Sequence, residues 1–148
     1  MDLKSLMVDT KDAWVEFPGC EGFEVQVVNL ARKELVALRT RCVTTKFDRQ
    51  TRQPIETLDD AKFIREFTKA TVKNWKGLKL KYLEELLLVD LGKSDPESLL
   101  EYSEENAAML VENSSTFDGW LNGVIFDLEN FRSESKSPNV GKTGKVAE

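Results

Sequence analysis

The feature that most constrains the fold is the helical spacing of apolar residues from about Thr57 onward. A helix predicted over about residues 59–75, capped by Thr57 or Asp59, has one apolar face. Its residues are Ile64, Phe67, Thr71 and Trp75. The last predicted helix has the same kind of face, at positions i, i+3, i+4 and i+7. Its residues are Leu121, Val124, Ile125 and Leu128. The spacing therefore predicts a helical part over residues 58–132.

The N-terminal part of the chain alternates apolar and polar residues in two short runs. The runs cover residues 14–17 and 23–28, and the breakers Pro18 and Gly19 lie between them. Alternating runs on either side of such a turn predict a β-hairpin.

Between these two parts, Asn29 can cap a helix over about residues 31–45. The polar stretch 48–54 is either a loop or the turn of a second hairpin. The predicted fold class is therefore mainly α with a small N-terminal β-hairpin element (α+β).

The chain of 148 residues has the length of one domain. We expect a single globular domain over residues 1–132, with a mixed strand and helix part at 1–57 and the helical part at 58–132. From residue 133 to 148 breakers and small polar residues dominate. This composition predicts a flexible tail.

The absence of histidine limits the chemistry open to the chain. It excludes Ser-His-Asp and Cys-His catalysis and most transition-metal sites. The two cysteines, Cys20 and Cys42, form no CxxC pair and are expected to be reduced thiols. We therefore expect no enzyme activity, no cofactor and no metal. An enzyme that uses carboxylates and lysines is a less favoured alternative.

Charge is distributed unevenly along the chain. Residues 62–81 carry seven basic side chains and one acidic side chain, whereas residues 94–131 carry nine acidic and no basic ones. The basic segment could follow the phosphates of a nucleic acid. Docking of the two segments on each other explains both, and the net charge of −5 disfavours nucleic acid. We expect no nucleic-acid partner, and a nucleic-acid-binding regulator remains the weaker alternative.

The sequence shows no pattern of a secretory signal peptide or of a membrane-spanning segment. The first residues have no long apolar run, and the longest such run is residues 86–89, far short of a bilayer span. We therefore expect no membrane partner and a location in the cytoplasm.

Five short motifs follow one another in a recognisable order from the middle of the chain. They are Trp75-Lys76-Gly77-Leu78, Tyr82-Leu83-Glu84-Glu85-Leu86-Leu87, Tyr102-Ser103-Glu104-Glu105-Asn106-Ala107-Ala108-Met109-Leu110, Phe117 with Trp120-Leu121, and Leu128-Glu129-Asn130-Phe131. This order resembles the tail assembly chaperones of long-tailed bacteriophages over about residues 70–131. The short reading frames of such families often end near a frameshift site that reads Gly-Lys, and Gly141-Lys142 and Gly144-Lys145 lie at that place.

The resemblance implies a protein that binds the tape measure protein, keeps it soluble and helps to recruit the major tail protein. It also implies action in the cytoplasm of the bacterial host and absence from the mature virion. Amphipathic helices with surplus aromatic and leucine surface can hold a partner helix in a groove. The candidate protein-binding residues are Trp75, Tyr82, Leu83, Leu86, Leu87, Phe117, Trp120 and Phe131. A homo-oligomer stays open, and a small phage or prophage adaptor or inhibitor that binds a host protein is the alternative.

Overall fold

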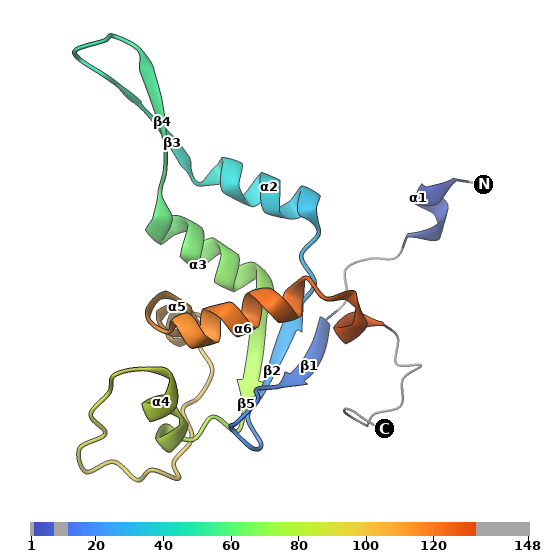
Figure 1. Ribbon diagram of the computed structural model, residues 1–148, viewed down its shortest axis with the longest axis vertical. Helices are drawn as coiled ribbons and strands as arrows, with labels where there is room; N and C mark the ends of the chain where they lie inside the picture. Colours follow the sequence, from blue (N-terminus) through green and yellow to red (C-terminus); the bar gives the residue numbers. More distant parts are fainter. Residues whose placement is uncertain (1, 8–11, 133–148) are drawn as a thin grey trace.

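The computed structural model describes residues 2–7 and 12–132 of the chain (Figure 1). The predicted tail at 133–148 lies outside these residues. The elements in chain order are α1 (Leu3–Leu6), β1 (Asp12–Glu16), β2 (Glu24–Val28), α2 (Arg32–Arg41), β3 (Val43–Phe47), β4 (Pro54–Leu58), α3 (Asp60–Thr71), β5 (Val72–Lys76), α4 (Leu80–Leu86), α5 (Glu104–Asn113), α6 (Ser115–Ile125) and the short 3-10 helix η1 (Leu128–Phe131).

The predicted N-terminal hairpin is confirmed as the antiparallel pair β1–β2, and it belongs to a larger sheet. Strand β5 pairs antiparallel with β2, so the sheet has the order β1-β2-β5. Successive side chains of a strand point to opposite faces. In β2 this places Val25 and Val27 on the buried face and Gln26 on the other.

The mainly α fold class predicted from the sequence is wrong, because the chain forms two sheets as well as its helices. The predicted helix over residues 59–75 ends at Thr71. The backbone of Val72 is already extended, with a φ of −111° and a ψ of 115°. Trp75 keeps helical spacing from Thr71, but it lies in β5 opposite Val25. The Trp75 side chain is therefore buried on the face of the sheet and not on the face of a helix. The spacing of apolar residues alone could not distinguish these two structures.

The second sheet is a lone hairpin that projects from the ends of α2 and α3 (Figure 1). The predicted helix over residues 31–45 stops at Arg41, and its N-cap is Ala31 rather than Asn29. Residues 48–53 form the turn between β3 and β4, so the second-hairpin alternative for the stretch 48–54 is the confirmed one. We call residues 43–58 the arm.

The core lies between the inner face of the three-stranded sheet and the helices α3, α5 and α6. Helix α6 crosses this face in Figure 1. Its Phe117 ring packs against the rings of Phe17 and Phe23, with centroids 5.9 and 6.4 Å apart. Asn29, instead of capping a helix, donates a hydrogen bond of 2.8 Å from Nδ2 to the carbonyl of Ile125 at the end of α6. The first strands and the last helix therefore share one interior.

Gly77 marks a close approach between two parts of the backbone. It has a φ of +75°, and a Cβ atom at this position would collide with the carbonyl oxygen of Gly22. Only glycine meets both conditions, because it favours positive φ and has no side chain.

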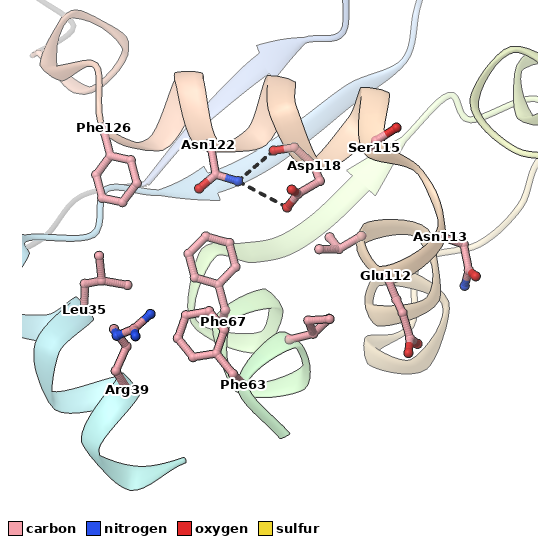
Figure 2. Close-up of a pocket in the computed structure, with 12 residues that line it drawn as sticks. Leu35, Arg39, Phe63, Phe67, Glu112, Asn113, Ser115, Asp118, Asn122 and Phe126 are labelled. Carbon is pink, nitrogen blue, oxygen red and sulfur yellow. Dashed lines mark hydrogen bonds between the residues drawn. The ribbon is translucent and has the colours of Figure 1, made fainter. Parts of the chain in front are cut away.

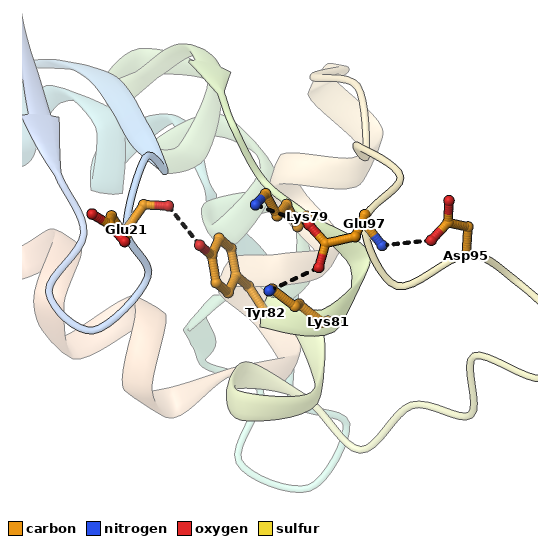
Figure 3. Close-up of polar contacts among 6 residues, drawn as sticks. All are labelled: Glu21, Lys79, Lys81, Tyr82, Asp95 and Glu97. Atoms are coloured by element: carbon orange, nitrogen blue, oxygen red, sulfur yellow. Dashed lines mark hydrogen bonds and ion pairs between the residues drawn. The ribbon is translucent and has the colours of Figure 1, made fainter.

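The basic and acidic segments meet as expected from their charges. Glu97 forms ion pairs with Lys79 at 3.0 Å and Lys81 at 2.8 Å (Figure 3). These contacts lower the pKa of Glu97, chiefly through the hydrogen bond from Lys81. Helix α3 of the basic segment also packs along α5 of the acidic one.

Candidate protein-binding site

The eight residues proposed from the sequence as a binding surface lie mainly in the core. Five of them are no more than 9% exposed, and these are Trp75, Leu83, Leu86, Phe117 and Phe131. The other three are half-buried and pack against that core, namely Tyr82, Leu87 and Trp120. A partner cannot reach the five buried side chains in this conformation.

Polar atoms among these residues also bond within the chain. The indole Nε1 of Trp75 donates a hydrogen bond of 2.9 Å to the carbonyl of Leu100. The hydroxyl of Tyr82 donates to the carbonyl of Glu21 in the hairpin turn (Figure 3). Both rings therefore anchor loops to the domain.

A groove of about 540 Å³ opens elsewhere, between α2 and α3 on one side and the end of α5 and α6 on the other (Figure 2). None of the eight predicted residues lines it. Its volume lies within the roughly 300–1,000 Å³ that is typical of binding pockets. We call this space the α3–α6 groove.

Aromatic and aliphatic side chains form the floor of the α3–α6 groove. Phe63 and Phe67 are four residues apart on α3, so they lie on the same side of the helix. Their rings stack with centroids 5.8 Å apart at 25°. Leu35 and Ile64 extend this apolar surface.

Polar groups form the rim. Helix α6 turns Phe117, Leu121 and Ile125 into the core, so its neighbouring stripe faces the groove with Asp118 and Asn122. Asn122 Nδ2 donates hydrogen bonds to the carbonyl of Asp118 at 2.8 Å and to its Oδ1 at 3.1 Å (Figure 2). These bonds hold both side chains along the groove.

Two further side chains that line the groove are distinctive. On the α2 side, the guanidinium carbon of Arg39 lies 5.8 Å from the centroid of the Phe63 ring, within cation–π distance. At the end of α6, Phe126 is 44% exposed and lines the groove. The rim thus combines one cation with the carboxylates of Glu112 and Asp118.

Sequence reasoning missed this groove because the candidate residues were taken from the motifs between Trp75 and Phe131, and none of these motifs includes a residue of α3 or Phe126. Phe63 adds an aromatic ring on α3 beyond the predicted face of Ile64, Phe67 and Thr71. Phe126 likewise adds an aromatic ring directly after the last core position of α6. Both excesses are visible in the sequence and indicate a second apolar surface.

A second cavity of about 420 Å³ lies between α3 and α5. Arg65 and Lys69 line one wall, and Glu104 and Glu105 line the other. Its opposed charges suit the contact between the basic and acidic segments of the chain itself.

The described residues offer little reactive chemistry. Among residues 2–7 and 12–132, no three cysteine, aspartate or glutamate side chains converge where they could hold a metal. Burial raises the pKa of the Cys20 thiol, and the charge of Glu85 raises it further, which disfavours the reactive thiolate. No helix in this part of the chain has the length and apolar character needed to cross a bilayer.

No family model matches the chain, and searches of curated proteins and of solved structures find no significant match.

Proposed function

We propose that the protein is a phage tail assembly chaperone that holds a helical segment of the tape measure protein in the α3–α6 groove. The observation that carries this proposal is the groove itself, which has an apolar floor, a polar rim and an open mouth. The order of sequence motifs from Trp75 to Phe131 supports the choice of family. In this role the protein keeps its partner soluble, helps to recruit the major tail protein in the host cytoplasm and leaves before the virion is complete.

The groove suits an amphipathic helix. Such a helix inserts side chains at i, i+3, i+4 and i+7 into an apolar groove and leaves its polar face in water. Phe63 and Phe67 provide the stacked aromatic floor for these side chains, and Phe126 provides an exposed ring at one end. Long helical proteins with uncovered apolar stripes tend to aggregate, so covering one stripe would increase their solubility.

The charge around the groove favours a partner with basic residues beside its apolar stripe. Glu112 and Asp118 line the rim, and both belong to the segment at 94–131 that has nine acidic residues and no basic ones. Opposite charges at a rim mainly increase the rate of association. Binding should therefore weaken as the salt concentration rises.

The test is co-expression with the tape measure protein, followed by measurement of its soluble fraction and of its affinity for the chaperone. The variant Phe126→Ser removes an exposed ring from the groove, and we expect about tenfold weaker binding. Leu128→Ser is the matched control, because Leu128 is also exposed (56%) but does not line the groove.

Three outcomes decide the proposal. About tenfold weaker binding by Phe126→Ser with normal binding by Leu128→Ser supports it. Equal binding by both variants removes the groove as the site. An unchanged soluble fraction of the tape measure protein with the wild-type chain contradicts the chaperone function.

A further inference from the structure

The arm presents to solvent a strand edge that pairs with no other strand among residues 2–7 and 12–132. All five residues of β3 are exposed, and within the described part of the chain β3 and β4 form a two-stranded sheet. A two-stranded hairpin is marginally stable in water by itself, and a free edge is a template for pairing with another strand. Phe47, which is 67% exposed near the tip, adds an uncovered aromatic ring.

The pairing pattern shows which backbone groups of β3 are free. Asp59 donates its N–H to the carbonyl of Cys42, and Asp48 donates its N–H to the carbonyl of Gln53. Because hydrogen-bonded and non-hydrogen-bonded pairs alternate along an antiparallel ladder, residues 44 and 46 also bond to β4. The N–H and C=O groups of Val43, Thr45 and Phe47 therefore point away from β4, toward the open edge.

The opposite edge of the arm is not equivalent. The outward positions of β4 are Pro54, Glu56 and Leu58, which lie opposite Phe47, Thr45 and Val43. Proline has no N–H to donate, and both proline and charged residues are typical of edges that resist pairing. The arm thus has one edge that can accept a strand and one that resists it.

We propose that the open edge of β3 pairs antiparallel with β3 of a second copy of this chain, about a two-fold axis at Thr45. In this register Val43 of each copy lies opposite Phe47 of the other, and the two Thr45 residues lie opposite each other. The three outward-facing residues of one strand meet the same three of the other, so all their N–H and C=O groups are satisfied. Self-complementarity of this kind is what an isologous dimer requires.

The side chains agree with this register. Val43, Thr45 and Phe47 share one face of the arm with their partners Leu58, Glu56 and Pro54. Pairing would form one apolar row across the four strands. In this row Leu58 and Val43 of one copy are followed by Phe47 and Pro54 of the second copy. A symmetric copy of this row forms at the other end. Such cross-strand apolar pairs stabilise sheets.

The charges of β3 permit the pairing, and the two edges limit it to two copies. On the other face Lys46 lies opposite Thr44 of the second copy, so no two like charges within the strands are directly opposed. Once the two β3 edges have paired, the outer edges of the four-stranded sheet are both β4 strands with Pro54. The assembly therefore stops at a dimer and does not continue as a fibre.

The first test compares proline substitutions on the two edges by sedimentation equilibrium of the full chain. Thr45→Pro removes an outward N–H from β3 and leaves the hydrogen bonds to β4 in place. We expect it to weaken dimerisation at least tenfold. Glu56→Pro is the matched control, because Glu56 is the cross-strand partner of Thr45 on the resistant edge. It should leave the dimer unchanged.

The second test uses the two-fold axis. Only a residue on the axis meets itself, with Cα atoms about 5.5 Å apart in a hydrogen-bonded pair, which is within disulfide range. Thr45→Cys should form a cross-linked dimer under mild oxidation, whereas Thr44→Cys should not. The native Cys20 and Cys42 are buried and do not interfere.

A monomeric wild-type chain at all concentrations overturns the inference. So does a dimer that survives Thr45→Pro, or one that is lost equally in both proline variants. Equal cross-linking of Thr45→Cys and Thr44→Cys overturns the register. None of these outcomes bears on the groove, which is tested separately with Phe126→Ser.

Discussion

The two hairpins of this protein have strands of equal length but opposite surroundings. Strand β2 of the first hairpin lies between β1 and β5 and has helices on one face, so Val25 and Val27 are fully buried. Strands β3 and β4 pair just as regularly over five residues, yet all but Leu58 are exposed. The comparison teaches that alternation and a turn are enough to define a hairpin. Whether a hairpin becomes part of the core or an exposed arm depends on which other strands and helices of the chain pack against it.

Hydrogen exchange should give the largest difference between the hairpins. Backbone amides of β2 should exchange only on global unfolding, which typically costs about 5–15 kcal/mol. Amides of β3 and β4 should exchange through local opening that costs a small fraction of this, since few buried contacts hold them. The measurement is amide exchange followed by NMR, at a concentration where the chain is monomeric. Equal protection of both hairpins would break the comparison.

Truncation of one aromatic ring in each hairpin should give the next largest effect. Phe23 is fully buried beside Trp75 and Phe117, so Phe23→Ala should lower the free energy of unfolding by about 3–5 kcal/mol. Phe47→Ala, on the exposed arm, should change it by less than about 0.5 kcal/mol. Urea denaturation of both variants is the check. A comparable loss in Phe47→Ala would mean that the arm is part of the cooperative core.

Two glycine substitutions distinguish the cost of a steric collision between two backbone segments from the cost of a positive φ alone. Gly77→Ala combines a positive φ with a collision against the carbonyl of Gly22, and should cost about 3 kcal/mol or more. Gly19→Ala also has a positive φ but meets open space, so it should cost about 1–2 kcal/mol. Thermal unfolding of the two variants measures the difference. Equal costs would show that the approach to Gly22 relaxes freely.

The smallest effect should come from the arm's turn and should depend on pH. The hydrogen bond from the backbone N–H of Gln50, and then that from the Thr51 hydroxyl, lower the pKa of Asp48 from its ordinary 3.8. A lowered folded pKa stabilises the turn at pH values above the ordinary one, and this contribution is lost as the pH falls through the folded value. The Gln50 amide shift, followed by NMR from about pH 5 to pH 2, should report this step. Asp48→Asn should abolish the step, and a step that persists would assign it to another group.

Local sequence features predicted those parts of the fold that local interactions determine. The hairpin at residues 14–28 and the cap at Asp59, one of the two capping positions expected, depend on neighbouring residues. Strand β5 does not, because its extended state depends on pairing with β2, far away in the chain. Helical spacing from Thr71 to Trp75 therefore gave the wrong structure.

The proposed binding surface was harder to predict, for a related reason. Aromatic and leucine residues are favoured both in cores and in interfaces, so composition cannot separate the two. Trp75 and Phe117 became core, whereas Phe63 and Phe126 line the α3–α6 groove. Which apolar face stays open is decided only when the helices have packed.

The bond between Asn29 and the carbonyl of Ile125 has a consequence for synthesis on the ribosome. Residues made early complete their burial only against α6, which is made late, so the nascent chain cannot close its interior for most of its translation. Until then Phe17 and Phe23 lack the Phe117 ring that covers them in the finished protein. A protein built in this way is itself exposed to aggregation during much of its synthesis.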